Sequence, residues 1–199
     1  MGPLFSEPEY LFVFYGAIAV AMGPDILREV RHRRADTDVA EAHDEGSKRV
    51  IGVVGGGGVL VGVAAAYLLP SMAISWHPRL VFAAGIVVLL VGGAVRQYAI
   101  RTLDDYFTTT VQIHDDQKVV DSGPYRWVRH PSYTGGLLEY AGFGLVLGNW
   151  VSLVTIVGGL AMAYVYRIRI EERTLSEELG EPYRRFLDRT PYRLFPYVW

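Results

Sequence analysis

The stretch that decides the fold is Ser122–Gly136, which reads SGPYRWVRHPSYTGG. Each of its two prolines, Pro124 and Pro131, fixes φ and lacks the N–H that a helix interior needs. A smooth continuation of an upstream helix is therefore disfavoured. We expect an ordered loop, called the central loop below, that can wrap a small polar molecule. The alternative is a membrane-surface loop whose aromatic and basic side chains serve as anchors.

Apolar segments lie on both sides of this loop. Of the 199 residues, 51% are hydrophobic, which is typical of an integral membrane protein. We interpret five segments as transmembrane helices: Tyr10–Met22, Val50–Leu69, Leu80–Ile100, Tyr133–Leu147 and Val151–Tyr166. The last two are joined by only three residues, so 133–166 is predicted to be an antiparallel helical hairpin. The predicted fold class is an all-α integral membrane protein with about five transmembrane helices.

The ends of the helices carry their own signals. Gly23-Pro24 is predicted to end the first apolar run. The fifth helix is expected to continue beyond the membrane until Gly180 and Pro182 stop it. The tail that follows has no apolar run of spanning length, and its aromatic and arginine residues predict an interfacial C-terminal cover.

The segment Val50–Leu69 is rich in glycine. Two pairs, Gly52/Gly56 and Gly58/Gly62, have the GxxxG spacing that lets transmembrane helices approach closely. A phosphate-binding loop would need a Gly-Lys-Ser/Thr ending, which this segment lacks. We therefore predict that these glycines serve helix packing.

The basic residues predict the orientation in the membrane. The three segments 25–49, 101–132 and 167–199 hold 17 of the 19 Lys and Arg residues. With five spans, all three lie on one side, and the positive-inside rule makes that side cytoplasmic. Residues 1–110 thus contain helices one to three with the basic cytoplasmic loop 25–49. Residues 111–199 contain the central loop, the hairpin 133–166 and a cytoplasmic C-terminal segment.

Composition excludes several classes of site. The chain has no cysteine, so it has no disulfide, no thiolate zinc site and no cysteine nucleophile. Its five histidines show no metal-ligand spacing, and we predict no metal site. No GxGxxG motif supports a Rossmann-type cofactor site. The charges of 25–49 have both signs, which favours a solvated loop over a nucleic-acid partner.

Three parts of the sequence together resemble the isoprenylcysteine carboxyl methyltransferase family. They are the run Gln117–Tyr125, the run Arg129–Tyr133, and Arg167 followed by Glu171-Glu172. That family includes prokaryotic relatives and is similar to the phospholipid N-methyltransferases. The resemblance covers roughly Val111–Leu194, so the first two predicted helices carry no motif. The loop alone also resembles the end of membrane sterol reductases.

The resemblance implies that S-adenosyl-L-methionine binds between the loop and the end of the last helix. The residues implied to contact the adenosine are Gln117, Lys118, Val119 and Val120. Those implied to hold the methionine part are Tyr125, His130, Pro131, Ser132 and Tyr133, with Glu171 completing the pocket. The implied catalytic residues are Arg167, facing the acceptor, and Glu172 beside it. Eukaryotic members usually have His where Gln117 stands, and a Gln cannot become a cation.

The implied acceptor is a lipophilic or prenylated substrate that reaches a cytoplasmic site from the surrounding membrane lipids. A carboxylate acceptor needs no general base, whereas an amine must lose a proton to Glu172 or His130. Two other classes of function remain open for the protein: a membrane reductase that uses NADPH, and a non-catalytic membrane scaffold. Each site residue also has a simpler interpretation, since His130 could cap a helix and Arg167 with Glu171 could be a surface ion pair.

Overall fold

A computed structural model describes residues 3–33, 46–107 and 118–199. Within these ranges the regular structure is helical, and the pairing of Ala73 with Asn149 is an isolated bridge. The α-helices are α1 (Pro8–Ala21), α2 (Gly23–Arg33), α3 (Ser47–Val50), α4 (Gly56–Leu68), α5 (Pro78–Leu103), α6 (Pro131–Val146), α7 (Trp150–Glu178) and α8 (Glu181–Arg189). Short 3-10 turns cover Leu4–Ser6, Pro70–Met72, Asp104–Tyr106 and Gly123–Arg126. The all-α prediction is confirmed.

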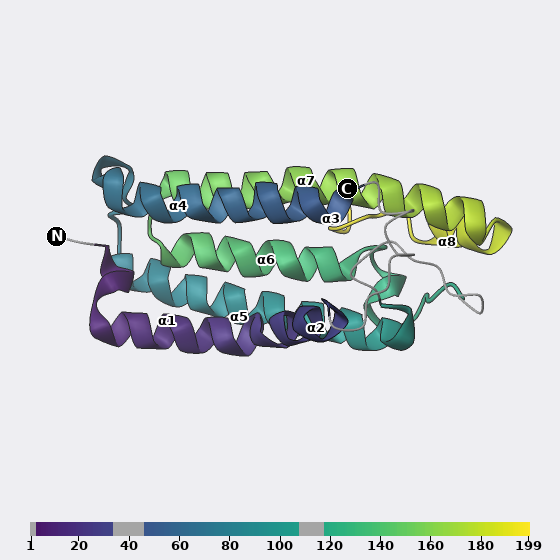
Figure 1. The fold of residues 1–199 in the computed structure, drawn as a ribbon, viewed down its shortest axis with the longest axis horizontal. Helices are drawn as coiled ribbons and strands as arrows, with labels where there is room; N and C mark the ends of the chain where they lie inside the picture. The colour runs from purple at the N-terminus through teal and green to yellow at the C-terminus, as the bar shows by residue number, and fades with distance from the viewer. Residues whose placement is uncertain (1–2, 34–45, 108–117) are drawn as a thin grey trace.

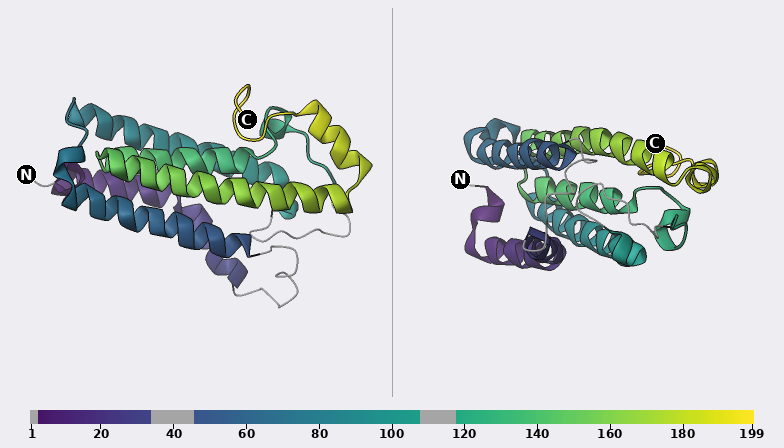
Figure 2. Two further views of the ribbon diagram at one scale, coloured as in Figure 1. Left: turned by 90° about the horizontal axis from the view of Figure 1, so that it is seen from above. Right: turned by 45° about the vertical axis from the view of Figure 1, so that its right-hand side comes forward.

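The helices form an elongated bundle (Figure 1). Helix α7 packs beside α4, α6 packs against both α7 and α5, and α1 packs on α5. The loop that precedes α6, the C-terminal part of α7 and the short helix α8 all lie at one end of the bundle (Figure 2). This arrangement brings the two regions that were predicted to share a site into contact.

Membrane-spanning length is reached by several of these helices. Three described helices are long and apolar enough to cross a membrane: Ser47–Leu68, which runs through α3, a π-helical turn (Ile51–Gly55) and α4, and then Pro78–Leu103 and Trp150–Glu178. The bent pair α1–α2 counts as a fourth if it is one broken span. Helix α6, with 16 residues, is shorter and lies against α5 and α7. The predicted hairpin and the extension of the last helix are both present.

The prediction that Gly23-Pro24 ends the first apolar run is confirmed, but a second helix follows at once. Helix α1 ends at Ala21, but α2 starts at Gly23 and continues at an angle of 51° to it. Proline is tolerated in the first turn of a helix, because the N–H groups there have no partner within the helix. These two residues therefore produce a bend, and the first part of the expected polar connection 25–49 is helical.

The glycine-packing prediction holds for one of its two pairs. A Cβ built on Gly62 would lie 2.7 Å from Cδ1 of Ile156, and one on Gly58 would lie 2.9 Å from the carbonyl oxygen of Thr155. These glycines therefore permit the close packing of α4 on α7. Among the described residues, nothing lies within 4 Å of a Cβ built on Gly52 or Gly56. The prediction is wrong for that pair.

The closest helix packing involves glycines that the sequence did not single out. In α5 and α6 they recur seven residues apart, as Gly85/Gly92 and Gly135/Gly142. A Cβ on Gly135 would lie 2.5 Å from the backbone N of Arg96, and one on Gly85 would lie 2.8 Å from the N of Val146. A side chain at these positions would have to displace backbone. The tight α5–α6 contact fixes the start of α6, and with it the end of the central loop.

Helix α7 is defined at both of its ends. The side chain of Asn149 accepts hydrogen bonds from the backbone N–H groups of Val151 and Ser152, which caps the first turn. At the other end Gly180 has φ of 59°, a left-handed value that glycine adopts readily. The chain then turns back into α8, whose buried Tyr183 and Phe186 face the pocket described next. The predicted cover is thus a short amphipathic helix.

Candidate active site

A pocket lies where the central loop meets α7 and α8. Nine of the residues predicted for the site line it: Lys118, Val119, Val120, Tyr125, His130, Ser132 and Tyr133 from the loop and the start of α6, and Arg167 and Glu171 from α7. Tyr183 and Phe186 of α8 close one side, and Leu103 at the end of α5 and Phe107 after the next turn contribute apolar surface. Residues that are remote in sequence therefore share one cavity.

Three predicted residues do not line the pocket. Gln117 lies outside the described residues. Pro131 is buried at the first position of α6, where its fixed φ suits the start of a helix. Glu172 belongs instead to a group of buried charges, described below. The structure therefore brings together the loop residues, Arg167 and Glu171, but it does not place Glu172 at the expected acceptor side.

Within the pocket a chain of hydrogen bonds joins α6 to α7. The Tyr133 hydroxyl donates to Oε2 of Glu171 at 2.7 Å, and Nε of Arg167 donates to the same hydroxyl oxygen at 3.3 Å. The imidazole of His130 stacks on the Tyr133 ring, with the ring centroids 5.6 Å apart. The predicted i,i+4 pair of Arg167 and Glu171 is thus joined through a tyrosine.

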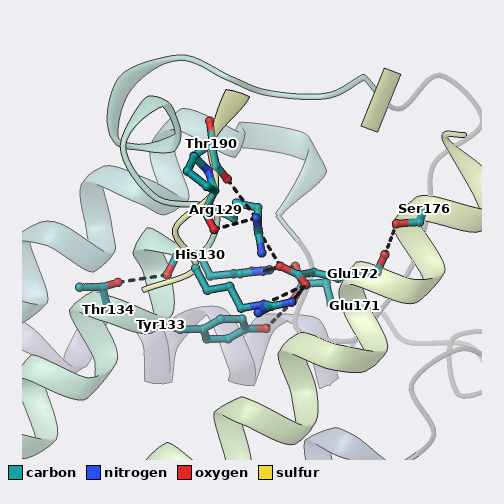
Figure 3. Close-up of polar contacts among 10 residues, drawn as sticks. Arg129, His130, Tyr133, Thr134, Glu171, Glu172, Ser176 and Thr190 are labelled. Carbon is teal, nitrogen blue, oxygen red and sulfur yellow. Dashed lines mark hydrogen bonds and ion pairs between the residues drawn. The ribbon is translucent and has the colours of Figure 1, made fainter. Parts of the chain in front are cut away.

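Glu172 is the centre of a buried group of charges, which we call the Glu172 cluster (Figure 3). Its Oε1 accepts from Nε of Arg129 at 2.8 Å and lies 3.2 Å from Nε2 of His130. Its Oε2 accepts from Nε and Nη2 of Arg193 at 3.0 and 2.8 Å. A buried carboxylate is tolerable when it is paired and hydrogen-bonded in this way. The cluster consists of Arg129, His130, Glu172 and Arg193.

The same cluster fastens the C-terminal tail to the central loop. The backbone N–H groups of Arg129 and His130 donate to the carbonyls of Tyr192 and Arg193, both at 2.9 Å. Nη1 of Arg129 also donates to the carbonyls of Thr190 and Pro191, both at 3.0 Å (Figure 3). The tail that follows α8 therefore holds the loop from outside the bundle and fixes the backbone at His130.

Two tyrosines at the pocket remain protonated at neutral pH. Burial, together with the nearby charge of Glu171, raises the pKa of Tyr125. Burial raises the pKa of Tyr183 too, and the charges of Glu171 and Glu172 add to that effect. The Tyr125 hydroxyl is buried and close to Ser132, yet it has no hydrogen bond of ordinary geometry among the described residues. A buried donor of this kind at a pocket suits a polar group of a ligand.

A second polar group connects α2 and α5 to the start of α6. Arg96 of α5 is paired with Asp25 of α2, and its Nη1 donates to the carbonyl of Ser132 at 3.0 Å. Asp25 is also paired with Arg28, at 2.7 Å, and accepts from Nε2 of Gln97 at 2.9 Å. Through Ser132 this group is linked to the wall of the pocket.

The sequence did not identify Arg129, Arg193 or Asp25 as parts of the site. Arg129 was noted within the motif, but its role depends on a tail residue 64 positions later, which no local pattern reveals. The adjacent basic residues Arg129-His130 before a proline were the available signal. For Asp25, the signal was the presence of Arg96 within an apolar helix, because a charge there needs a partner.

Comparison with known proteins gives consistent matches. Residues 84–177 match the model of the isoprenylcysteine carboxyl methyltransferase (ICMT) family. A protein of Oryza sativa subsp. indica named probable protein-S-isoprenylcysteine O-methyltransferase is 32% identical over 123 residues, which are 61% of this chain and 63% of that protein. The protein-S-isoprenylcysteine O-methyltransferase of Saccharomyces cerevisiae is 32% identical over 122 residues, which are 59% of this chain and 51% of that protein. The matches thus span less than two thirds of these relatives.

A solved structure agrees with the fold. It is the structure of the eukaryotic intramembrane Ras methyltransferase ICMT, which is 25% identical, has a TM-score of 0.58, and is matched over 96% of this chain and 64% of that chain. Together with the long apolar helices, this likeness confirms an all-α, multi-pass integral membrane protein. The structural similarity also includes α1–α4, which lie outside the segment that carries the sequence motifs.

Proposed function

We propose that this protein is a membrane methyltransferase that uses S-adenosyl-L-methionine, because residues 84–177 match the model of the isoprenylcysteine carboxyl methyltransferase family. The acceptor that we propose is lipophilic, namely the α-carboxylate of an isoprenylcysteine-like group. Bound S-adenosyl-L-methionine would supply an activated methyl group on a positively charged sulfur. The observation that carries the proposal is the meeting of loop residues with Arg167 and Glu171 around one pocket.

The residues of the pocket suit this cofactor. A carboxylate such as Glu171 can bind an ammonium group or a ribose diol, and His130 can bind a carboxylate. The aromatic faces of Tyr125 and Tyr133 suit a positively charged sulfur. The Tyr125 hydroxyl, buried and without a regular hydrogen bond among the described residues, offers one more donor. We assign Lys118, Val119 and Val120 to the adenosine side.

Arg167 is the residue that we assign to the acceptor. It is buried where the apolar part of α7 ends, and a guanidinium can hold a carboxylate through two parallel hydrogen bonds. A carboxylate is already an anion at neutral pH and needs no base. The work left to the protein is to align one carboxylate oxygen with the methyl group and to exclude water from it.

The surroundings of Glu172 argue against it as the base that an amine acceptor would need. An amine acceptor must lose a proton, for which Glu172 or His130 was the available base. Glu172 is bound to two arginines and to His130, and such partners stabilise the ionised carboxylate against taking up a proton. We therefore assign Glu172 to holding His130 and the tail in place.

We place the pocket on the cytoplasmic side. Three exposed serines test this: Ser6 is in the turn before α1, Ser71 is in the turn between α4 and α5, and Ser122 is in the loop that leads to Tyr125. The first two turns lie at the end of the bundle away from α8 (Figure 1). Cysteines introduced singly at Ser6 and Ser71 should react with an impermeant thiol reagent added outside intact cells, and one at Ser122 should not. The chain has no other cysteine, so the background is low. The reverse pattern would put the pocket on the outer side.

The transfer reaction itself is tested with three acceptors. Purified protein and radiolabelled S-adenosyl-L-methionine are incubated with a prenylated cysteine analogue, with its methyl ester, or with phosphatidylethanolamine. We expect transfer to the free carboxylate alone. Transfer to phosphatidylethanolamine would make the protein an amine methyltransferase. Cofactor binding with no transfer to any of the three would refute the proposed acceptor class.

A further inference from the structure

Ser47 lies in the first half of the chain, where no motif of the family occurs. It begins α3, ahead of the π-helical turn, and its side chain is fully buried. Nη1 of Arg167 donates a hydrogen bond to its Oγ at 2.6 Å. A residue outside the matched segment 84–177 therefore contacts the arginine that we assign to the acceptor.

The packing of α3 on α7 holds Ser47 in place. Ile51, one turn after Ser47, packs in the hydrophobic cluster that includes Tyr164 and Ile168 of α7. These two residues lie on either side of Arg167 along the same helix. The position of the Ser47 hydroxyl relative to the guanidinium is therefore fixed by apolar contacts that do not depend on the hydrogen bond itself.

We propose that Ser47 is a positioning residue for the acceptor, a role that rests on the proposed function. The Arg167 guanidinium is held at Nη1 by Ser47 and at Nε by Tyr133. An arginine side chain has many rotamers, and two fixed contacts on one planar group restrict its rotation. Ser47 thereby orients the plane of the guanidinium, which decides how a carboxylate can be bound.

The chain offers a matched control in Ser152. This serine is also fully buried, lies on α7, and donates a hydrogen bond of 2.6 Å from Oγ to the carbonyl of Gly62 in α4. Its hydrogen bond joins the same two helical segments, but it contacts no residue of the pocket. Ser152→Ala thus removes an equally buried interhelical hydrogen bond without touching Arg167.

The experiment compares Ser47→Ala and Ser152→Ala in steady-state transfer to the prenylated cysteine analogue. We expect Ser47→Ala to lower kcat/KM for the acceptor by roughly threefold to tenfold and to leave affinity for S-adenosylhomocysteine within about twofold. Ser152→Ala should change neither value. Ser47→Cys, with a similar volume and a weak acceptor atom, should share the defect of Ser47→Ala. In the Arg167→Lys background Ser47→Ala should have less effect, because the two residues act together.

Three results would overturn the role of Ser47. They are acceptor kinetics equal to those of Ser152→Ala, an equal loss of S-adenosylhomocysteine affinity, or an effect as large in Arg167→Lys as in the wild type. The proposed function would fail in a different way, because the wild-type protein would then transfer no methyl group to the carboxylate analogue. If the wild type is active and Ser47→Ala has the same kinetics, only the positioning role is refuted.

Discussion

Glu171 and Glu172 are neighbours in sequence, yet they belong to different regions of the molecule. Glu171 lies in the pocket, its side chain is 29% exposed, and it accepts a hydrogen bond from Tyr133. Glu172 is 11% exposed and is bound by Arg129, His130 and Arg193. Consecutive residues of an α-helix point about 100° apart, which places one carboxylate at the cavity and the other behind it.

The difference separates a glutamate that can bind a ligand from one that supports the fold. A partly exposed carboxylate with a neutral partner can exchange that partner for a ligand at low cost. A buried carboxylate with two guanidinium partners cannot, because its removal leaves the buried charge of Arg129 without its carboxylate. We therefore expect Glu171 to affect mainly ligand affinity and Glu172 to affect mainly the stability of the fold. Four substitutions test this division.

The largest effect is expected for Glu172→Ala. Breaking a buried ion pair by removing one partner costs about 3–5 kcal/mol, and here Arg129 would remain buried without its carboxylate. Thermal unfolding in detergent micelles should show a strongly lowered midpoint. The matched control is Glu171→Ala, which should cost no more than about 1 kcal/mol. Equal loss of stability in the two variants would remove the distinction between the two sides.

Glu171→Ala should instead weaken cofactor binding. Loss of one hydrogen bond to a charged group costs about 1.5–3 kcal/mol, which corresponds to roughly tenfold to a hundredfold in affinity for S-adenosylhomocysteine. Calorimetric titration of the folded variant measures this directly. An unchanged dissociation constant would mean that the carboxylate does not contact the cofactor, and the proposed pocket would have to be redrawn.

Arg167→Lys tests the acceptor side of the pocket. The substitution keeps the positive charge but loses the planar fork, so transfer to a carboxylate acceptor should fall by about tenfold, or about 1.4 kcal/mol of transition-state stabilisation. Affinity for S-adenosylhomocysteine should change much less. Single-turnover transfer beside a cofactor titration separates the two quantities. Poor cofactor binding with normal transfer at saturation would place Arg167 on the cofactor side.

The smallest effect is expected for Tyr125→Phe, and its sign should differ between the stability of the protein and its affinity for the ligand. Without ligand the variant should be as stable as the wild type or slightly more stable, because a buried hydroxyl without a regular hydrogen bond is removed. Affinity for S-adenosylhomocysteine should fall by about threefold to tenfold, as for one neutral hydrogen bond. A variant that loses stability but binds normally would show that the hydroxyl serves the fold.

The sequence was sufficient to predict the apolar helices, because each apolar segment carries its own signal. The segment 150–178 illustrates this, since its apolar part and its charged extension form one continuous helix. The helix that follows Gly23-Pro24 was not predicted, because the same two residues can end one helix and begin the next. The packing of Gly85 and Gly92 on α6 depends on which two helices come together, which the sequence of one helix does not reveal.

The site was predictable only where its residues lie within motifs. Most of the predicted loop residues and Glu171 were found in this way, and they do line one pocket. The partners that hold them in place, such as Arg193 and Ser47, come from segments without a motif. Their roles depend on which helices pack together, and a local pattern contains no information on that. The same limit explains why two adjacent glutamates could not be assigned to different sides.

The central claim is that the pocket between the loop and α7 binds S-adenosyl-L-methionine. The most direct test is a calorimetric titration of the purified wild-type protein with S-adenosylhomocysteine and, separately, with NADPH. We predict saturable binding of S-adenosylhomocysteine at one site per chain and no binding of NADPH. Binding of NADPH without S-adenosylhomocysteine would indicate a reductase, and binding of neither would contradict the assignment of this pocket.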